Sequence, residues 1–394
     1  MQRDELTAWL RLTLTEGVGN TTARKLLAAF GLPDAVFAQS SAALGQLATA
    51  AQVKALQTQP EGLDALTQTT ADWLAGTQRD GVMRRCVTLA DPHYPRALLA
   101  LDDPPLVLYV TGSQAVFSAI ASKEVATDIA IVGSRNPTPQ GQSNARQFAE
   151  SLAASGLHVV SGLALGVDGA AHSGALDAFE AAPGIAGSTV AVVGTGLDRV
   201  YPKRHYELAH RIAQFGIIIS EFPIGTPPLP NNFPKRNRII SALTQGTLVV
   251  EAAVKSGSLI TARLAAEQGK DVFAIPGSIH STLSKGCHLL IKQGAKLVES
   301  ANDVLEELSY PAAVQLRLPV HEDADTNTDT DTASQASEES DLLQALGHDP
   351  VSLDALIART GIGIPTLQAR LMELELMGDV ARLPGGLFQR QFNA

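Results

Sequence analysis

Aromatic residues, cysteines and long apolar runs are scarce in this chain of 394 residues. Aromatic residues make up 5% of the sequence, and its two cysteines, Cys86 and Cys287, lie far apart. Two distant cysteines supply neither a disulfide framework nor a cysteine-rich metal site, and they fit the reducing cytoplasm, where we expect the protein. No run of 18 or more apolar residues occurs, so we predict no membrane span.

The sequence also lacks the short motifs that bind nucleotide cofactors or metals. It contains no G-x-x-x-x-G-K-[ST] segment, so nucleotide hydrolysis by a P-loop is unsupported. Gly194-Thr195-Gly196 lacks the third glycine of a dinucleotide fingerprint, which argues against NAD binding. We find no metal-ligand cluster, no nucleophile elbow and no paired carboxylates. The sequence therefore predicts no cofactor, no metal and no catalytic residue.

Charge is distributed unevenly along the chain, whose formal net charge is -10. Residues 318–341 contain eight acidic residues and no lysine or arginine. Residues 131–300 instead contain fifteen lysines and arginines against eleven acidic residues, a net of +4. A negative total disfavours a nucleic-acid partner, but here it mostly describes the acidic segment and not the middle of the chain.

Composition divides the chain into four regions. Residues 1–85 have apolar residues at helical spacing, which predicts a helical domain, and residues 86–310 alternate strands and helices. Residues 311–337 have the Asp/Thr/Ser-rich composition of a disordered linker. Residues 338–394 contain helix-forming segments, then a strand, a Pro-Gly-Gly turn and a second strand, an order that predicts a winged helix. Glu373 and Glu375 on its third predicted helix favour a protein partner over duplex DNA.

The N-terminal region contains a glycine-rich segment from Gly17 to Leu27 that looks like a helix-hairpin-helix, as in SAM-like domains. In related motifs the turn amides hold a DNA phosphate. The same segment also suits a scaffold hairpin that binds nothing. The sequence leaves both interpretations open.

Six short apolar runs predict the strands of one sheet. They lie at residues 129–132, 157–160, 190–193, 217–219, 248–250 and 272–275, mostly separated by Ala-rich stretches long enough for crossover helices. Strands buried on both faces of a parallel sheet have such continuous apolar sequences. The pattern predicts an α/β fold with an extended, Rossmann-like, doubly wound sheet.

Small and polar residues follow these predicted strands. Gly133-Ser134-Arg135 follows the first, Ser161-Gly162 the second and Ser256-Gly257-Ser258 the fifth. Because the carboxyl ends of parallel strands share one edge of the sheet, we expect these residues to converge there. Small residues let backbone N–H groups approach phosphates closely. The two serines can alternatively serve only to cap the helix that follows them.

The segment from Asn231 to Arg238 combines the ring of Phe233 with the cations of Lys235, Arg236 and Arg238. A ring on which a base can stack, flanked by cations for phosphates, is the chemistry that single-stranded nucleic acid requires. The alternative is a strand-to-helix turn whose basic residues are merely solvated.

Four acidic or histidine side chains near the same edge invite a catalytic interpretation. Asp168 and His172 are spaced i, i+4 on a predicted helix, which is more typical of a structural pair than of an acid–base pair. Glu221 and Glu251 end predicted strands and can equally orient an arginine.

The central region closely resembles the DNA-processing protein A family, DprA, also called Smf. Many motifs carry this resemblance in order: Gly133-Ser134-Arg135, Ser161-Gly162-Leu163-Ala164-Leu165-Gly166-Val167-Asp168, Gly194-Thr195-Gly196-Leu197-Asp198 with Tyr201-Pro202, Ser220-Glu221, Phe233-Pro234-Lys235-Arg236-Asn237-Arg238, Ser256-Gly257-Ser258-Leu259-Ile260-Thr261, Pro276-Gly277 and Gly286-Cys287. The helical N-terminus and the winged helix match the longer family members.

The resemblance implies a protein that binds single-stranded DNA without performing chemistry. Members of this family protect incoming DNA during natural transformation (competence). They load the RecA recombinase onto that DNA, displacing or bypassing single-strand-binding protein. They act as homodimers through the Rossmann-like domain.

The resemblance also assigns a DNA-binding role to particular side chains. Arg135 is expected to grip a phosphate, and Phe233 to stack a base. The full set of expected contacts is Gly133, Ser134, Arg135, Ser161, Gly162, Lys203, Arg204, Phe233, Lys235, Arg236, Asn237, Arg238, Ser256, Gly257, Ser258, Thr261 and Lys285. One position departs from the family pattern, since His205 stands where the family usually has asparagine.

A second function fits the same fold class. Related Rossmann-like proteins include phosphoribohydrolases, which cleave the base from a nucleoside monophosphate. Their Pro-Gly-Gly loop followed by Thr and Glu is not found around Ser256-Gly257-Ser258. Because the fold class matches but this signature is missing, we keep such an enzyme as the alternative hypothesis and not as the leading one.

Overall fold

The computed structural model describes residues 2–77, 82–122, 128–308, 342–343, 345–346, 350–383 and 385–391. The predicted acidic linker, residues 311–337, lies outside these ranges. Within them, no helix is both long enough and apolar enough to cross a bilayer.

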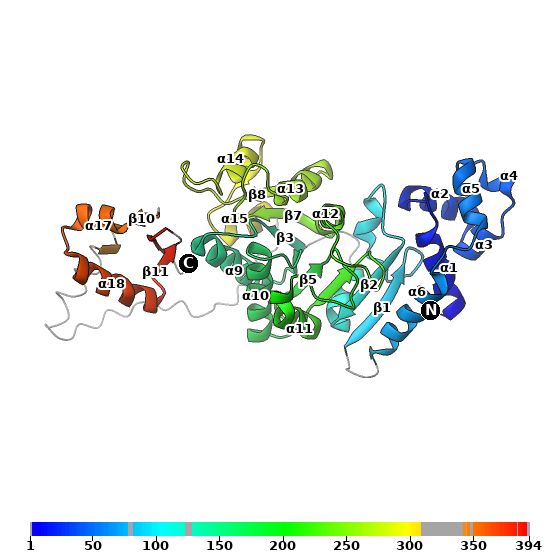
Figure 1. Cartoon of the computed structure of the whole chain (residues 1–394), viewed down its shortest axis with the longest axis horizontal. Coiled ribbons are helices and arrows are strands. Elements are labelled where there is room, and N and C mark those ends of the chain that lie inside the picture. Colours follow the sequence, from blue (N-terminus) through cyan, green and yellow to red (C-terminus); the bar gives the residue numbers. More distant parts are fainter. Residues whose placement is uncertain are drawn as a thin grey trace.

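The N-terminal region is helical, as predicted (Figure 1). Its helices are α1 (Arg3–Leu14), α2 (Asn20–Phe30), α3 (Pro33–Phe37), α4 (Ser41–Leu44), α5 (Ala50–Gln57) and α6 (Leu63–Ala75). Helix α5 begins with a capping box in which Thr49 and Gln52 satisfy each other's backbone amides. The core of this region contains Trp9, which is 1% exposed, and it continues onto Tyr109 of the sheet.

One nine-stranded sheet forms the centre of the molecule, in the order β1-β2-β6-β5-β4-β3-β7-β8-β9. The strands are β1 (Met83–Thr88), β2 (Val107–Gly112), β3 (Asp128–Val132), β4 (Val159–Ser161), β5 (Thr189–Val192), β6 (Ile217–Ser220), β7 (Thr244–Val249), β8 (Asp271–Ala274) and β9 (Lys296–Leu297). Strands β3 to β9 pair in parallel, whereas β2 pairs antiparallel with both β1 and β6. The predicted domain boundary at residue 85 falls inside β1.

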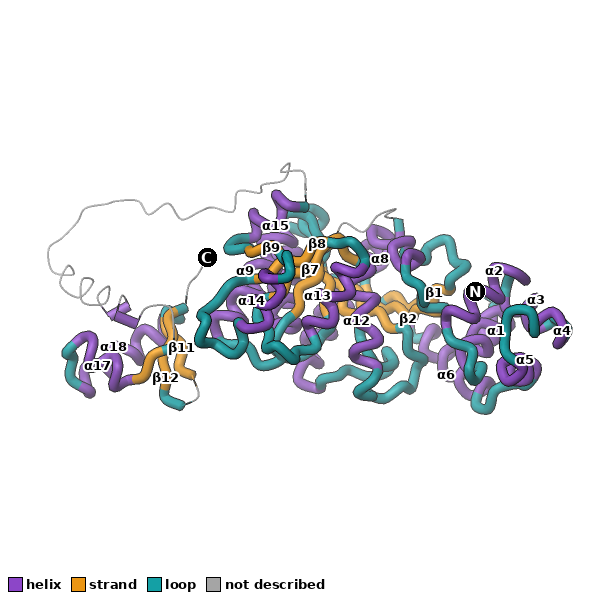
Figure 2. Tube along the Cα trace, turned by 90° about the horizontal axis from the view of Figure 1, so that it is seen from above, coloured by secondary structure: helices purple, strands orange, loops and turns teal. Residues whose placement is uncertain are grey.

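Helices cover both faces of this sheet, which makes it doubly wound (Figure 2). One face packs against α8 (Gln114–Ala121), α12 (Asn232–Ala242), α13 (Ser258–Glu267) and α14 (Lys285–Lys292). The other packs against α9 (Pro139–Ala154), α10 (Val167–Ala181), α11 (Tyr206–Phe215) and α15 (Ala301–Glu307). Two short 3-10 helices, η1 (Arg96–Ala100) and η2 (Lys203–His205), complete this part. The predicted α/β class and six parallel strands are thus confirmed, with ends shifted by a few residues.

The C-terminal region has the predicted winged-helix order. Helices α17 (Leu353–Thr360) and α18 (Ile364–Met377) precede the wing strands β11 (Val380–Leu383) and β12 (Leu387–Arg390). A short strand, β10 (Val351–Ser352), joins them in the order β10-β12-β11. Leu356, Leu371 and Phe388 are buried in its small core.

Candidate nucleic-acid interface

A groove of about 720 Å³ opens at the carboxyl ends of β3 and β7. These two strands are neighbours, but the chain leaves β3 towards β4 on one side and β7 towards β8 on the other. Ligands of doubly wound sheets bind at such a switch point. A groove of this volume is large enough for a small ligand or a segment of a polymer.

The lining of the groove combines charged, polar and apolar groups. Its cations include the exposed Arg135 and Lys255, and its aromatic rings are those of Tyr201 and Phe233. The lining also includes the polar residues Ser134, Asp168, Arg236, Ser256, Ser258 and Thr261, and the prolines Pro228, Pro230 and Pro234. The predicted residues Gly133, Asn237 and Gly257 also line the groove.

Phe233 and Arg135 lie together in this groove, as the sequence predicted. Phe233 is half-buried in the first turn of α12, and the guanidinium carbon of Arg135 lies 5.8 Å from its ring centroid. The ring packs on Gly194, where an added Cβ would come within 3.2 Å of it. Among the described residues, no carboxylate forms an ion pair with Arg135, so this cation is available to a phosphate.

Helix α12 corrects the interpretation of its basic residues. The segment, whose alternative interpretation was a turn with solvated cations, is helical from Asn232 onward, so its cations point in different directions. Lys235 remains half-exposed, whereas Arg236 and Arg238 are 4% and 8% exposed. Both buried arginines make structural contacts and neither belongs to an exposed cationic patch around Phe233, although Arg236, unlike Arg238, also lines the groove.

Arg236 lines the groove and fixes the loops around it. Its Nη1 donates a hydrogen bond of 2.6 Å to the carbonyl of Val192, at the end of β5. The guanidinium also occupies the space beside Gly162, where an added Cβ would lie 1.7 Å from Nη1. Burial lowers the pKa of Arg236 to about 10, an effect that the nearby Asp168 opposes, so the arginine stays charged at neutral pH.

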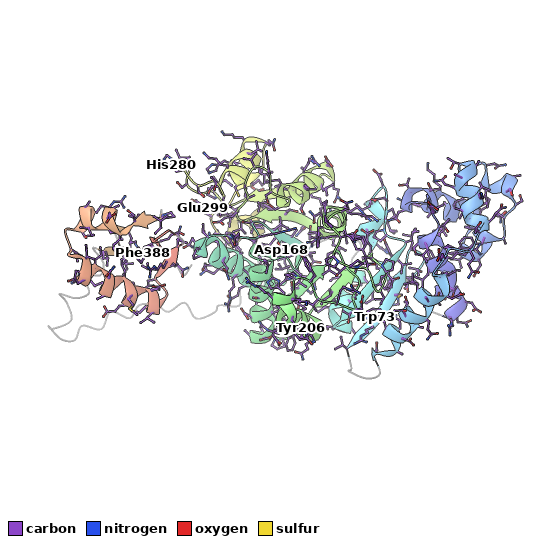
Figure 3. All side chains as sticks on the ribbon, viewed as in Figure 1. Trp73, Asp168, Tyr206, His280, Glu299 and Phe388 are labelled. Carbon is purple, nitrogen blue, oxygen red and sulfur yellow. The ribbon has the colours of Figure 1, made fainter. Side chains whose placement is uncertain are left out.

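Asp168 lies beside Arg236 near the middle of the central domain (Figure 3). Its Oδ2 accepts hydrogen bonds from the amides of Gly162 and Ala164, at 3.1 and 3.2 Å. Burial raises the pKa of Asp168, while Arg236 and these two amides oppose the rise. The carboxylate therefore organises the loop between β4 and α10.

His172 confirms the structural interpretation of this pair. Its Nε2 accepts a hydrogen bond from the amide of Leu163, and its Nδ1 lies 2.7 Å from the hydroxyl of Thr189, which itself donates to Val159. Burial lowers the pKa of His172 to about 3, with smaller contributions from His205 and Arg236. The imidazole is therefore neutral and enclosed, unlike an acid–base catalyst.

Arg238 belongs to a second buried network, outside the groove lining. It forms an ion pair with Glu221, whose side chain is 4% exposed, and its Nε lies 3.2 Å from Asp103. Lys235 lies 3.6 Å from the same Glu221. Burial raises the pKa of Glu221, and Arg238 and Lys235 oppose this.

Glu251 has a different role from the one we considered. Its carboxylate accepts hydrogen bonds from the amide and the hydroxyl of Thr138, at 2.9 and 2.6 Å. This contact ties the loop after β3, which carries Arg135, to the end of β7. Because Glu221 and Glu251 are both engaged elsewhere, neither is positioned as a free catalytic carboxylate for the phosphoribohydrolase hypothesis.

The start of α13 lines the groove with hydroxyl groups. The hydroxyls of Ser256 and Ser258 are 2.7 Å apart, and Ser256 also accepts a hydrogen bond from the amide of Ser258. Asn237 lies 3.5 Å from the carbonyl of Gly257. The N-cap of α13 is Gly257, with no side-chain cap hydrogen bond, so the capping alternative is not observed, and both serines line the groove.

Other predicted contacts lie away from the groove. Ser161 is fully buried, and its hydroxyl donates to the carbonyl of Ile131 at 2.7 Å, so its side chain cannot reach a phosphate. Gly162 is buried beside Arg236. Lys203 and Arg204 are exposed in η2, just after Tyr201, while Lys285 donates to the carbonyl of Ile279.

His205, at the position where the family usually has asparagine, has a packing role. Its Nδ1 lies 3.0 Å from the carbonyl of Leu163, and its ring sits against Gly169, where an added Cβ would come within 2.7 Å. The residue supports the same loop that Asp168 and His172 hold.

The sequence did not identify three kinds of groove residue. Tyr201 lies in the loop after β5, Lys255 in the loop after β7, and Pro228 and Pro230 precede α12. Tyr201 and Lys255 follow strands at the predicted binding edge, which is a signal that could have found them. The prolines carry no comparable signal.

The glycine-rich segment near the N-terminus contacts the rest of the chain. Asn20 donates to the carbonyl of Asp103 at 3.2 Å, and Arg24 donates to the carbonyl of Leu101 at 2.9 Å. Gln52 donates to Gly17 at 2.7 Å. These contacts favour the scaffold interpretation of the hairpin.

Comparison with known proteins agrees with the motifs and the fold. The family model described as "DNA recombination-mediator protein A" matches residues 85–309, and that of the "DprA winged helix domain" matches residues 326–386. Protein Smf of Escherichia coli K12 is 43% identical over 296 residues, which cover 74% of each chain. DNA processing protein DprA of Streptococcus pneumoniae is 43% identical over 223 residues, covering 57% of this chain and 74% of that protein.

A solved structure extends this agreement to three dimensions. The X-ray structure of DprA from Streptococcus pneumoniae superposes with a TM-score of 0.59 at 33% identity. The alignment covers 78% of this chain and 98% of that one. From the matched family model, the similar relatives and the shared fold, we conclude that this chain belongs to the DNA recombination-mediator protein A family, whose members are named DprA or Smf.

Proposed function

We propose that this protein binds single-stranded DNA in the groove between β3 and β7, without performing chemistry on it. Membership of the family places the protein in DNA processing and recombination. The observation that carries the proposal is the exposed Arg135, 5.8 Å from the half-buried ring of Phe233 in that groove. A cation and an accessible ring together can hold one phosphate and one unpaired base.

Single strands fit this chemistry better than duplex does. A base inside a duplex is already stacked and paired, so Phe233 can take it only at the cost of opening the helix. The groove supplies Arg135, Lys255 and the hydroxyls of α13 to the backbone. Arg236 and Asp168 are positioning residues, which hold the loops around the groove.

In the winged helix, the described residues favour a protein partner over DNA. Residues 350–391 contain four arginines and four acidic residues, so the charges cancel. Glu373 and Glu375 are exposed on α18, the helix that enters the major groove in DNA-binding relatives of this motif. Acidic side chains at this position repel phosphates.

The wider role follows the family. We propose that the bound strand is incoming DNA, which the protein protects during natural transformation in the cytoplasm. We further propose that it loads the RecA recombinase onto this strand and interacts with single-strand-binding protein. We assign a homodimer contact to the central domain, where Leu289 and Leu297, 36% and 50% exposed, supply apolar surface beside the edge strand β9.

Binding to a labelled oligothymidine strand and to a duplex of equal length tests the proposal. We expect the wild type to prefer the strand and to lose affinity as salt rises, because phosphate contacts release counterions. Arg135→Ala should weaken binding to all sequences and reduce the slope of log K against log salt by about 0.7, the value for one phosphate of a single strand. The matched control is Arg146→Ala on α9, whose side chain is 59% exposed and pairs with Asp177.

Equal affinity for strand and duplex, or an Arg135→Ala variant that binds like the control, would contradict the proposal. Incubation with nucleoside monophosphates tests the alternative enzyme. Free base that appears with the wild type but not with Glu251→Gln would favour a phosphoribohydrolase.

A further inference from the structure

The groove contains a second aromatic ring, to which neither the motifs nor the family comparison assigns a role. The ring of Tyr201 lies 5.6 Å from that of Phe233, centroid to centroid, with 36° between their planes. The two rings come from different parts of the fold, since Tyr201 lies in the loop after β5 and Phe233 begins α12. Tyr201 is 47% exposed, so it is one of the large side chains that the fold leaves accessible.

Tyr201 lines the groove together with Phe233 and the prolines Pro228, Pro230 and Pro234. The same lining contains the cations Arg135 and Lys255 and the hydroxyls of α13. A single strand presents flat apolar bases as well as charged phosphates. The two rings therefore suit its bases, and the cations suit its phosphates.

The spacing of the rings fits two successive bases. Bases along one strand of B-form DNA lie about 3.4 Å apart along the axis. The rings of Tyr201 and Phe233 are 5.6 Å apart, so two neighbouring bases reach both rings when the strand is extended beyond the B-form spacing. The guanidinium carbon of Arg135 lies 5.8 Å from the Phe233 ring centroid, which puts a cation for the backbone beside the two rings.

We propose that Tyr201 and Phe233 form a two-base stacking site, with each ring holding one of two successive unpaired bases of an extended strand. The proposal rests on single-strand binding in this groove and adds to it the number of bases held, their spacing and a new contact residue. The competing explanation is that Tyr201 only supports the Phe233 ring from the side.

A double-mutant cycle separates these two explanations. The affinity for a labelled oligothymidine strand is measured for the wild type, Tyr201→Leu, Phe233→Leu and the double variant. Leucine keeps apolar bulk against the neighbouring prolines but removes the ring. If each ring holds its own base, Tyr201→Leu weakens binding about 5- to 150-fold, the range for one stacked base, in both the wild-type and the Phe233→Leu background.

Four further measurements complete the test. Tyr201→Phe retains a ring and should bind much more tightly than Tyr201→Leu. Ile185→Ala, at an exposed side chain outside the groove lining, should bind like the wild type. Energy transfer between dyes on the two ends of the strand should report a longer strand on the wild type than on Tyr201→Leu. Thermal melting of each variant shows whether any loss of binding reflects misfolding.

The outcomes distinguish this proposal from the one on which it rests. Unchanged affinity in Tyr201→Leu, or a loss that disappears in the Phe233→Leu background, overturns the two-base site. In that case a wild type that still prefers single strands, and still depends on Arg135, leaves the proposed function intact. If Tyr201→Leu melts early, its affinity is measured below its melting transition and compared with that of Tyr201→Phe. Equal weakening of the two variants also overturns the two-base site.

Discussion

Replacing Arg238 by methionine should destabilise the protein rather than weaken a DNA contact. The pair formed by Arg238 and Glu221 is almost completely buried, with side chains 10% and 4% exposed. Removing Arg238 leaves the carboxylate of Glu221 buried without this ion-pair partner, and such a loss costs about 3–5 kcal/mol of unfolding free energy in comparable pairs. In a domain of about this size each kcal/mol lowers the melting temperature by about 2–4 °C. We therefore expect a drop of about 6–20 °C.

The loss should depend on pH in a known direction. Burial raises the pKa of Glu221, and Arg238 opposes this rise. Without Arg238 the pKa rises further, so the folded variant holds a proton on Glu221 that the unfolded chain has lost. Stability then increases as pH falls. The difference in melting temperature between the wild type and Arg238→Met should therefore become smaller as the pH falls from 7 to 5.

Two measurements complete this test. The double variant Arg238→Met, Glu221→Leu removes the buried charge as well as its partner, and it should recover much of the lost stability. Titration with oligothymidine below the melting transition should give an affinity close to that of the wild type. A variant that melts within 2 °C of the wild type but binds the strand weakly would refute the reasoning and restore Arg238 as a DNA contact.

Three further predictions concern buried or remote groups. Burial lowers the pKa of Lys270 to about 8, so above that pH the unfolded chain holds more protons than the folded protein does. The unfolding free energy of the wild type relative to Lys270→Met should therefore rise between about pH 8 and 10. Urea denaturation at several pH values checks the direction of this change. Burial raises the pKa values of Cys287 and Cys86 to about 11 and 12, so mass spectrometry should find neither thiol alkylated by iodoacetamide at pH 8 unless urea is added. Deleting residues 338–394 should leave the affinity for oligothymidine within about 2-fold of the full chain, because binding resides in the central groove; a loss comparable to that of Arg135→Ala would move the site to the winged helix.

The sheet was predictable because its strands are short apolar runs between helical segments. The start of β7 was missed, since Thr244 to Gly246 includes polar residues and a glycine that read as a turn. In the fold these residues pair with β3 and β8, and tertiary pairing overrides their local preference. The winged helix was predictable because its wing contains an evident turn between two apolar segments.

The site was predictable only in part, for a reason visible in α12. The sequence shows that Phe233, Arg236 and Arg238 are close along the chain, but not which way each side chain points. Pro234 in the first turn was a sign of a helix start. A helix rotates successive residues by about a hundred degrees, which turns Arg236 towards the β5 end and Arg238 towards Glu221. Contacts such as Tyr201 with Phe233 depend on the tertiary fold, which local patterns do not specify.

The most direct test of single-strand binding in the groove is photochemical crosslinking to a 5-bromouridine strand, followed by mapping of the crosslinked peptides by mass spectrometry. We predict that the main crosslink lies in the peptide containing Phe233, and that it is lost in Arg135→Ala at the same protein concentration. A main crosslink within residues 350–391 or within α1–α6, unaffected by Arg135→Ala, would contradict it.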